Sequence, residues 1–166
     1  MISKLKEHPY ILRFYFVMML IGGLCLIGRH YEVRFFKNIS KSSPHKLFLG
    51  CKTCAIERDM YAIVLPESRL VKQYLGEVPI IKRILGMPGD QIQIHERKIF
   101  LNNEYVGEVE PSRIKDIQLS AIKEKTIPES SYFLVSDNTI DGFDSRYEEF
   151  GLIKQEQIKY RVWPIF

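Results

Sequence analysis

The stretch VPIIKRILGMPGD (78–90) places two cations in a run of isoleucine, valine and leucine and then turns at a proline–glycine pair. Isoleucine and valine favour strands, and Pro-Gly favours turns. Side chains alternate between the two faces of a strand, so Lys82 shares its face with Ile80 and Ile84. Arg83 lies on the opposite face, which is also apolar. The pattern predicts a strand covered on both sides.

A lysine on a covered face is a candidate general base. Burial costs the charged amine its hydration, and desolvation lowers the pKa of buried lysines to about 5–6 in documented cases. A neutral amine can accept a proton at working pH. The alternative is that Lys82 pairs with a carboxylate or extends into solvent. The catalytic hypothesis therefore requires a nucleophile, an oxyanion donor and a structural brace elsewhere in the chain.

Composition limits the architecture. The chain has 166 residues, 46% of them hydrophobic and 27% charged, which suffices for one globular domain and a short appended segment. The formal net charge of +4 is spread along the chain without the block of like charges that marks a nucleic-acid-binding tail. We therefore expect no nucleic-acid partner.

The appended segment is YILRFYFVMMLIGGLCLIG (10–28), whose only charge is Arg13. About 20 apolar residues span the ~30 Å hydrocarbon layer, and Arg13 lies close enough to the start to reach the headgroups. We expect an uncleaved transmembrane anchor after a tail of residues 1–9. A cleaved signal peptide and a buried core helix are the alternatives, but residues 29–31 lack the small side chains of a processing site.

Residues 29–166 predict a mainly β, antiparallel domain on the far side of the membrane from the short tail. Short segments rich in Ile, Val, Tyr and Phe are separated by turn residues. They are residues 61–66, 78–85, 91–95, 98–101, 131–135 and 157–166. Asn102-Asn103 predicts a hairpin turn. Segments 67–76 and 111–124 are each expected to hold a helical turn or a loop.

The candidate nucleophile follows the span in NISKSSPHKLFL (38–49), as a Ser-x-Ser-x-Pro pattern over residues 40–44. Proline restricts the residue before it and stiffens this loop. As an isolated motif the pattern is weak, because serines are common in loops.

Taken in order, the span, Ser-x-Ser-x-Pro, KRILGMPGD (82–90) and SDNTIDGFDSRYEEFGLI (136–153) resemble the type I signal peptidase superfamily. The Asn-x-x-x-Ser-x-Pro pattern and the closing RVWPIF (161–166) are similar to its conjugative-transfer branch, the TraF-type peptidases. The resemblance covers nearly the whole chain.

The resemblance implies a Ser-Lys dyad in which Ser42 is the nucleophile and Lys82 its general base. Ser43 is the competing nucleophile, one position out of the family's register. The Ser40 hydroxyl and the Ser42 N–H would stabilise the oxyanion.

Asp144, Ser145 and Arg146 match the block that braces the site in the family. We expect Arg83 to pair with Asp144, because a guanidinium fork suits a buried carboxylate. Gly142 stands where many members have a serine that hydrogen-bonds the lysine. Ser145, Ser136 or a water remain as alternative partners of Lys82.

The implied function is that of a membrane-anchored serine endopeptidase, with no metal or organic cofactor, that cleaves exported precursors after small residues. Its domain would lie on the periplasmic side of a bacterial inner membrane. The conjugative branch implies a pilin precursor as substrate, the transfer machinery as a partner and, for some members, a cyclised product. A housekeeping signal peptidase, a non-catalytic envelope or pilus-assembly component, and a soluble LexA-like autoprotease are the alternatives, and the span argues against the last.

Cys51 and Cys54 form a C-x-x-C motif, and Cys25 lies inside the span. A structural disulfide, two free thiols, a redox pair and a zinc site with His45 or His95 all remain open. A disulfide is preferred if the domain lies in an oxidising compartment.

Overall fold

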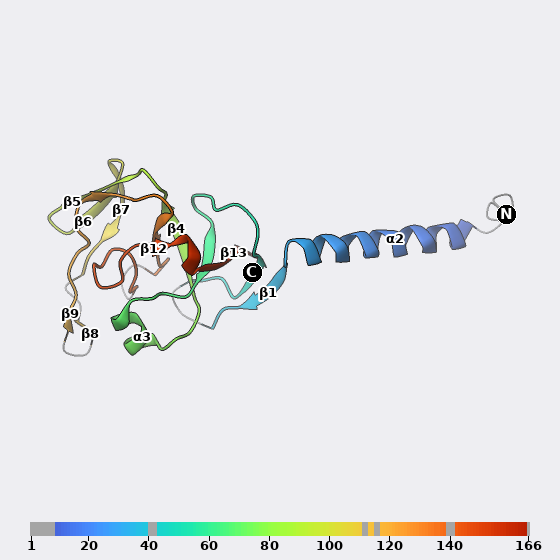
Figure 1. Ribbon diagram of the computed structural model, residues 1–166, viewed down its shortest axis with the longest axis horizontal. Helices are drawn as coiled ribbons and strands as arrows, with labels where there is room; N and C mark the ends of the chain where they lie inside the picture. The colour runs from blue at the N-terminus through green and yellow to red at the C-terminus, as the bar shows by residue number, and fades with distance from the viewer. Residues whose placement is uncertain (1–8, 40–42, 111–112, 115–116, 139–141, 166) are drawn as a thin grey trace. The chain divides into compact units, whose positions relative to one another are not determined.

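The computed structural model describes residues 9–39, 43–110, 113–114, 117–138 and 142–165. Within it the chain divides into two compact units, Met1–Val33 and Arg34–Phe166 (Figure 1). Ser40 and Ser42, the sequence-predicted oxyanion and nucleophile residues, lie outside the described part.

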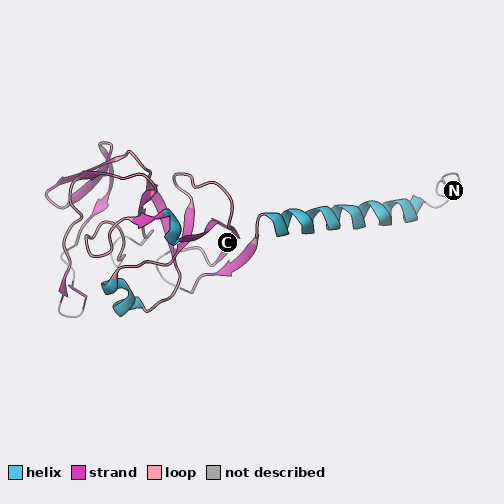
Figure 2. Cartoon of the chain, in the orientation of Figure 1, coloured by secondary structure: helices cyan, strands magenta, loops and turns pink. Residues whose placement is uncertain are grey.

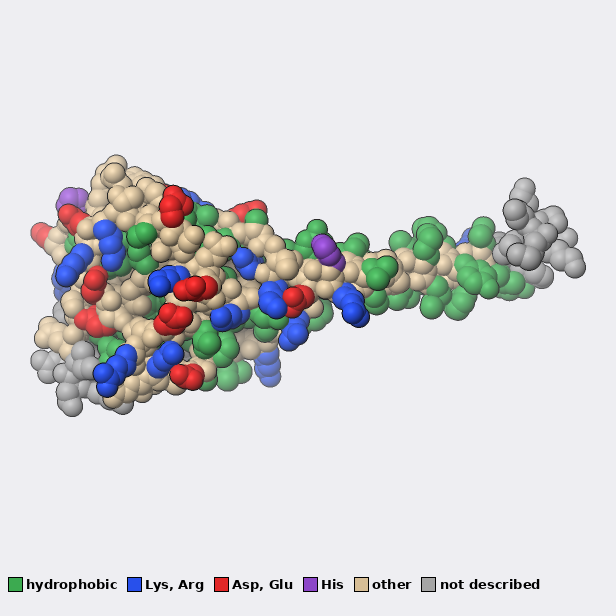
Figure 3. Space-filling view, in the orientation of Figure 1, with side chains coloured by type: hydrophobic (Ala, Val, Ile, Leu, Met, Phe, Trp, Pro, Cys, Tyr) green, Lys and Arg blue, Asp and Glu red, His purple; other side chains and the backbone are tan. Residues whose placement is uncertain are grey.

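The first unit contains the apolar helix α2 (Pro9–His30). Its 22 residues extend about 33 Å at 1.5 Å per residue, which matches the hydrocarbon thickness of a bilayer. Most of its apolar side chains are exposed, and hydrophobic side chains cover it in Figure 3. The helix has the length and composition of a membrane span, as expected for residues 10–28.

The second unit is built on a seven-stranded antiparallel sheet (Figure 2). In sheet order its strands are β1 (Arg34–Lys37), β2 (Leu47–Cys51), β13 (Ile158–Pro164), β3 (Tyr61–Val64), β4 (Ile80–Gly86), β11 (Ser131–Val135) and β12 (Ile153–Lys154). The short helix η1 (Gln155–Gln157) joins β12 to β13. The predicted mainly β, antiparallel fold is confirmed.

A second, four-stranded sheet has the order β10 (Lys125–Thr126), β5 (Gln91–His95), β6 (Lys98–Leu101) and β7 (Glu104–Glu108). β6 and β7 are joined by Asn102 and Asn103, both with positive φ (50° and 69°). Asparagine tolerates this left-handed conformation better than most residues, which explains its use in the predicted hairpin turn.

The main hydrophobic core draws on both sheets. Ile84 of β4, Phe133 of β11 and Ile92 of β5 are among its almost fully buried members. Lys82 and Gly86 are buried on the same face of β4 as Ile84, whereas the residues of the opposite face are only half-buried. The expected covering of this strand on both sides is therefore found from Lys82 to Gly86 on the face of the lysine, and the opposite face is only partly covered.

Segment 67–76 forms the helix α3 (Arg69–Leu75), which begins after Ser68, whose hydroxyl accepts a hydrogen bond from Val71 N–H. Segment 111–124, for which a helical turn or a loop was expected, has no helix among its described residues. Its described residues form the two-residue strands β8 (Arg113–Ile114) and β9 (Ile117–Gln118) and an isolated bridge from Ala121 to Tyr147. Strands β1 and β2 were not predicted.

Cys51, the last residue of β2, forms a disulfide with Cys54. Two cysteines bonded to one another cannot also bind zinc as thiolates, which removes the zinc alternative for this pair. The cross-link closes the turn after β2.

Replacing both Cys51 and Cys54 by serine should lower the free energy of unfolding by about 1–2 kcal/mol, because so short a cross-linked loop constrains the unfolded chain only modestly. Urea unfolding of the full chain in detergent measures this, with Cys25→Ser as the control. Equal unfolding midpoints for wild type with and without reductant would contradict the disulfide.

Candidate active site

Lys82 occupies the middle of β4, where it is paired with Ala62 of β3. Its side chain is 6% exposed, and its Nζ lies 6.0 Å from the centre of the Phe150 ring. Lysine is seldom buried to this degree without a dedicated partner. The burial predicted from the alternation of residues 78–85 is confirmed.

Burial lowers the pKa of Lys82 to about 8. The Asp144 and Asp137 carboxylates oppose this shift because they stabilise the ammonium form, and the Arg146 guanidinium adds to it. With a pKa of about 8, roughly a tenth of the amine is neutral at pH 7 and half at pH 8. An amine in this range can accept a proton near neutral pH.

The hydrogen-bond partner of Lys82 is Ser136, the residue directly after β11. The lysine Nζ donates to Ser136 Oγ. Of the partners left open by the sequence, Ser145 is engaged elsewhere: its hydroxyl donates to Gly151 O (2.7 Å) and accepts from Leu134 N–H (3.1 Å). Ser145 thus ties the strand β11 to the following loop.

Asp144 and Arg146 form an ion pair with no exposed surface on either side chain. The guanidinium donates from Nε to Asp144 Oδ1 (2.8 Å) and from Nη2 to Oδ2 (3.0 Å). It also donates to the carbonyl oxygens of Glu108 (2.9 Å) and Gly142 (3.1 Å). The pair joins the loop after β11 to β7 of the second sheet.

The expected pairing of Arg83 with Asp144 is wrong. Neighbouring residues of a strand point to opposite faces, so Arg83 points away from the side on which Lys82 meets the Asp144 charge. Arg83 instead lines a separate hollow together with Arg58 and Tyr105.

The loop between β1 and β2 contains the Ser-x-Ser-x-Pro block and is closed by Asn38. The backbone N–H of Asn38 donates to Lys46 O (2.8 Å), and its side-chain amide donates to His45 O (3.0 Å). These two hydrogen bonds hold together the ends of the loop on either side of residues 40–42. This contact gives a structural reason for the asparagine in Asn-x-x-x-Ser-x-Pro.

After residues 40–42, Ser43 is 7% exposed. Burial raises the pKa of Tyr61, and the nearby Ser43 side chain opposes this shift. Ser43 Oγ also accepts from His45 N–H (3.4 Å). The Tyr61 hydroxyl in turn donates to Asp137 Oδ2 (2.9 Å). Sequence reasoning missed this chain of contacts from the serine loop to the residue next to Ser136, since nothing in the sequence of β3 signals it.

A cavity of about 560 Å³ opens beside Lys82. Its walls come from residues 37–39 before the serine block, residues 74–75 at the end of α3, residues 78–82, and residues 138 and 142–143. β11 pairs with β4 only over Arg83–Gly86, so the backbone of Ile80 to Lys82 lies beyond that pairing. The cavity thus combines the lysine, the entrance to the serine loop and a strand edge.

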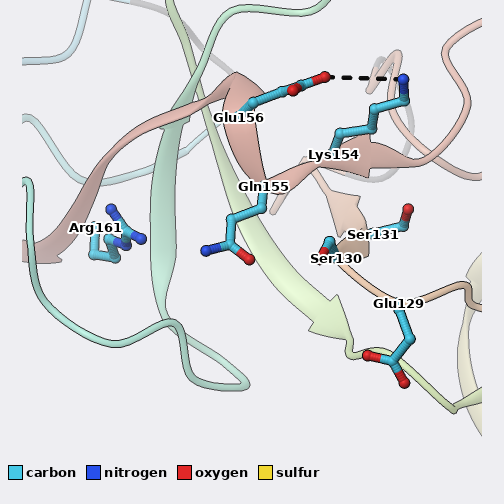
Figure 4. A pocket seen from close by; sticks show the side chains of 7 residues that line it. All are labelled: Glu129, Ser130, Ser131, Lys154, Gln155, Glu156 and Arg161. Atoms are coloured by element: carbon cyan, nitrogen blue, oxygen red, sulfur yellow. Dashed lines mark ion pairs between the residues drawn. The ribbon is translucent and has the colours of Figure 1, made fainter.

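A second hollow, of about 670 Å³, lies beside β12 and η1 and contains none of the predicted site residues. Figure 4 shows side chains of both charges around it, among them an ion pair between Lys154 and Glu156 (3.8 Å). Because Glu129, Lys154 and Glu156 are exposed and the charges around the hollow largely offset one another, we do not consider it the reactive site.

Asp144→Asn should lower the free energy of unfolding by about 3–5 kcal/mol, because it leaves the buried Arg146 charge without its partner. The matched control is Glu110→Gln, which breaks the Arg97–Glu110 pair at the same kind of distance (2.7 Å) but on the surface. That change should cost less than about 1 kcal/mol. Equal costs for the two variants, measured by urea unfolding, would contradict a structural role for Asp144.

The chain is similar in sequence to known proteins. The family profile described as "Signal peptidase, peptidase S26" matches residues 13–165. The chain is 31% identical over 90 residues to signal peptidase I V of Bacillus subtilis (48% of this chain, 52% of that protein). It is 31% identical over 99 residues to signal peptidase I of Bacillus caldolyticus (51% of this chain, 53% of that protein).

Among solved structures, a signal peptidase I from Enterococcus faecalis aligns with a TM-score of 0.43 and 22% identity over 64% of this chain and 95% of that one. The chain spans about half the length of the curated relatives named above. A profile match over more than nine-tenths of the sequence, from the apolar helix to the last strand, establishes the relationship. The chain belongs to the signal peptidase family, peptidase S26.

Proposed function

We propose that the protein is a membrane-anchored serine endopeptidase in which Ser42 is the nucleophile and Lys82 the general base. The observation that carries the proposal is the buried Lys82 amine, with a pKa of about 8, beside a cavity that is also lined by the residues preceding Ser40 and Ser42. Family membership supports the same chemistry.

In the proposed reaction, neutral Lys82 takes the proton of the Ser42 hydroxyl as its oxygen attacks the scissile carbonyl carbon. The Ser40 hydroxyl and the Ser42 N–H stabilise the oxyanion. The tetrahedral intermediate collapses, the leaving amine takes the proton from Lys82, and an acyl-enzyme remains. Water, deprotonated by Lys82, then attacks the ester carbonyl carbon. Lys82 returns this proton to the Ser42 oxygen as the ester bond breaks and the new carboxyl end is released.

Ser42 is preferred to Ser43 as nucleophile because the Ser43 hydroxyl already has a buried structural role. Ser43 is 7% exposed, its Oγ accepts from His45 N–H (3.4 Å), and its side chain lies close to the Tyr61 hydroxyl of β3. A nucleophile needs its oxygen free to reach the substrate.

The substrate would bind as an extended strand against the backbone of Ile80 to Lys82, beyond the pairing with β11. Such strand addition draws affinity from main-chain hydrogen bonds and selectivity from pockets for alternate side chains. Cleavage after small residues, the family's preference, is the corresponding proposal for selectivity.

The proposed location is a bacterial inner membrane with residues 29–166 on the periplasmic side. Helix α2 supports the anchoring. The Cys51–Cys54 disulfide supports an oxidising compartment for the domain, because such bonds persist outside the cytosol.

The narrower proposal, a conjugative-transfer peptidase that acts on a pilin precursor, rests on residue pattern alone. The pattern consists of Asn38, Ser42 and Pro44 at the spacing Asn-x-x-x-Ser-x-Pro, together with RVWPIF at residues 161–166. A substrate panel tests it by comparing the cleavage of a pilin precursor with the cleavage of a secretory preprotein that has a small residue before its cleavage site. A cyclised product would have a mass lower by one water than the linear product.

Ser42→Ala and Lys82→Ala should each reduce cleavage of a co-expressed precursor by at least about 10²–10⁴-fold, because each removes an essential member of the dyad. Lys123→Ala, at an exposed lysine, is the matched control and should cleave as wild type does. Ser43→Ala should retain measurable cleavage. Immunoblots of precursor and product measure all four, and full cleavage by either dyad variant would overturn the proposal.

A further inference from the structure

We propose that Ser136 is the residue that positions Lys82, and that residue 142 must be glycine because Ser136 and the Asn138 carbonyl oxygen fill the space in which a side chain at 142 would lie. The structural part of this inference stands on packing alone. Its catalytic part rests on the proposed function, in which Lys82 is the base.

The Lys82–Ser136 contact joins two buried groups. Lys82 is 6% exposed and Ser136 2%. With so little solvent around it, the amine depends on protein groups for its orientation, and Ser136 Oγ accepts its hydrogen bond.

Ser136 is itself fixed before any substrate binds. Its backbone N–H donates to Asp144 Oδ2 (2.9 Å), and the same carboxylate is held by Arg146. The residue before it, Val135, is paired with Arg83 at the end of β11. The hydroxyl is thus held in place by the sheet on one side and by the buried ion pair on the other.

Gly142 lies beside this hydroxyl, and a side chain at residue 142 would have no space. A Cβ atom at residue 142 would lie 2.7 Å from Ser136 Cβ and 2.8 Å from Ser136 Oγ. It would also lie 2.5 Å from the carbonyl oxygen of Asn138. All three distances are far shorter than the contact distances of about 3.5–4.0 Å between non-bonded carbon atoms.

Backbone conformation does not explain the glycine. The glycines with positive φ are Gly76, Gly89, Gly107 and Gly151, and Gly142 is not one of them. Space is therefore the constraint at residue 142, and that space is occupied by the Asn138 carbonyl oxygen and the Ser136 side chain.

The two positions exclude one another as sources of the hydroxyl. In this chain the hydroxyl that Lys82 contacts belongs to residue 136, on the other side of the same space, and residue 142 has no side chain. Under the proposed function, Ser136 therefore supplies the hydroxyl that residue 142 lacks.

Four variants of the full chain test the exchange. Ser136→Ala removes the hydroxyl and adds no atom. Gly142→Ala adds a Cβ in the occupied space. Ser136→Gly/Gly142→Ser moves the hydroxyl to residue 142, and Ser136→Gly/Gly142→Ala is its matched control. The two double variants differ by a single oxygen, and both must shift the Asn138 carbonyl, so this cost cancels between them.

We expect Ser136→Ala to lower kcat by about 10²-fold with KM within about twofold of wild type, because a misplaced base slows the chemical step without altering substrate binding. Gly142→Ala should lower both kcat and the melting temperature. Ser136→Gly/Gly142→Ser should have a kcat at least about tenfold above that of Ser136→Gly/Gly142→Ala. Cleavage of a purified precursor in detergent and circular dichroism melting curves provide the measurements.

Unchanged kcat in Ser136→Ala, or equal kcat in the two double variants, would overturn the inference. These outcomes are distinct from a failure of the proposed function. If the proposed function failed, the wild-type protein would show no cleavage, or its cleavage would not depend on Ser42 and Lys82. Ser136→Ala keeps the test decisive even if Gly142→Ala fails to fold, since it only removes an atom.

Discussion

The structure depends on the exclusion of water from one amine group, that of Lys82. Lys82 is buried on the core side of β4, and the resulting drop in its pKa, from 10.5 to about 8, corresponds to roughly 3 kcal/mol against the charged form. A domain whose net stability is about 5–15 kcal/mol gives up a substantial part of it to hold this group. The two sheets, their shared core and the loop after β11 together form the enclosure that makes the amine a base near neutral pH.

The buried Asp144–Arg146 ion pair limits how far the Asp144 carboxylate can raise the pKa of Lys82. An isolated Asp144 carboxylate would stabilise the ammonium form and raise the pKa of Lys82. Because Arg146 neutralises that carboxylate with two hydrogen bonds, its net effect on the amine is reduced. Asp144 also holds the backbone of Ser136, so one carboxylate serves the charge balance and the placement of the lysine's partner at once.

Local pattern predicted the regular elements well. The strands over residues 91–95, 98–101 and 131–135 have the predicted bounds, because alternation and β-branched residues are local signals. The strands β1 and β2 were missed because they are short and flank a polar loop. In the site, the burial of Lys82 could be predicted from its neighbours in the sequence. Its contact with Ser136 joins residues 54 apart, and no local pattern selects this partner. The strand alternation that placed Lys82 also argues against an Arg83–Asp144 pair.

The pKa of the Lys82 amine tests the central claim most directly. Nuclear magnetic resonance of the full chain in detergent, with carbon-13 and nitrogen-15 in its lysines, follows the side-chain signals as pH rises, and Lys82→Met identifies the signal of this residue by its loss. A titration midpoint at about 8 is the result that burial beside a neutralised carboxylate predicts. A midpoint at about 10 or above, the range of a solvated lysine, would contradict the account.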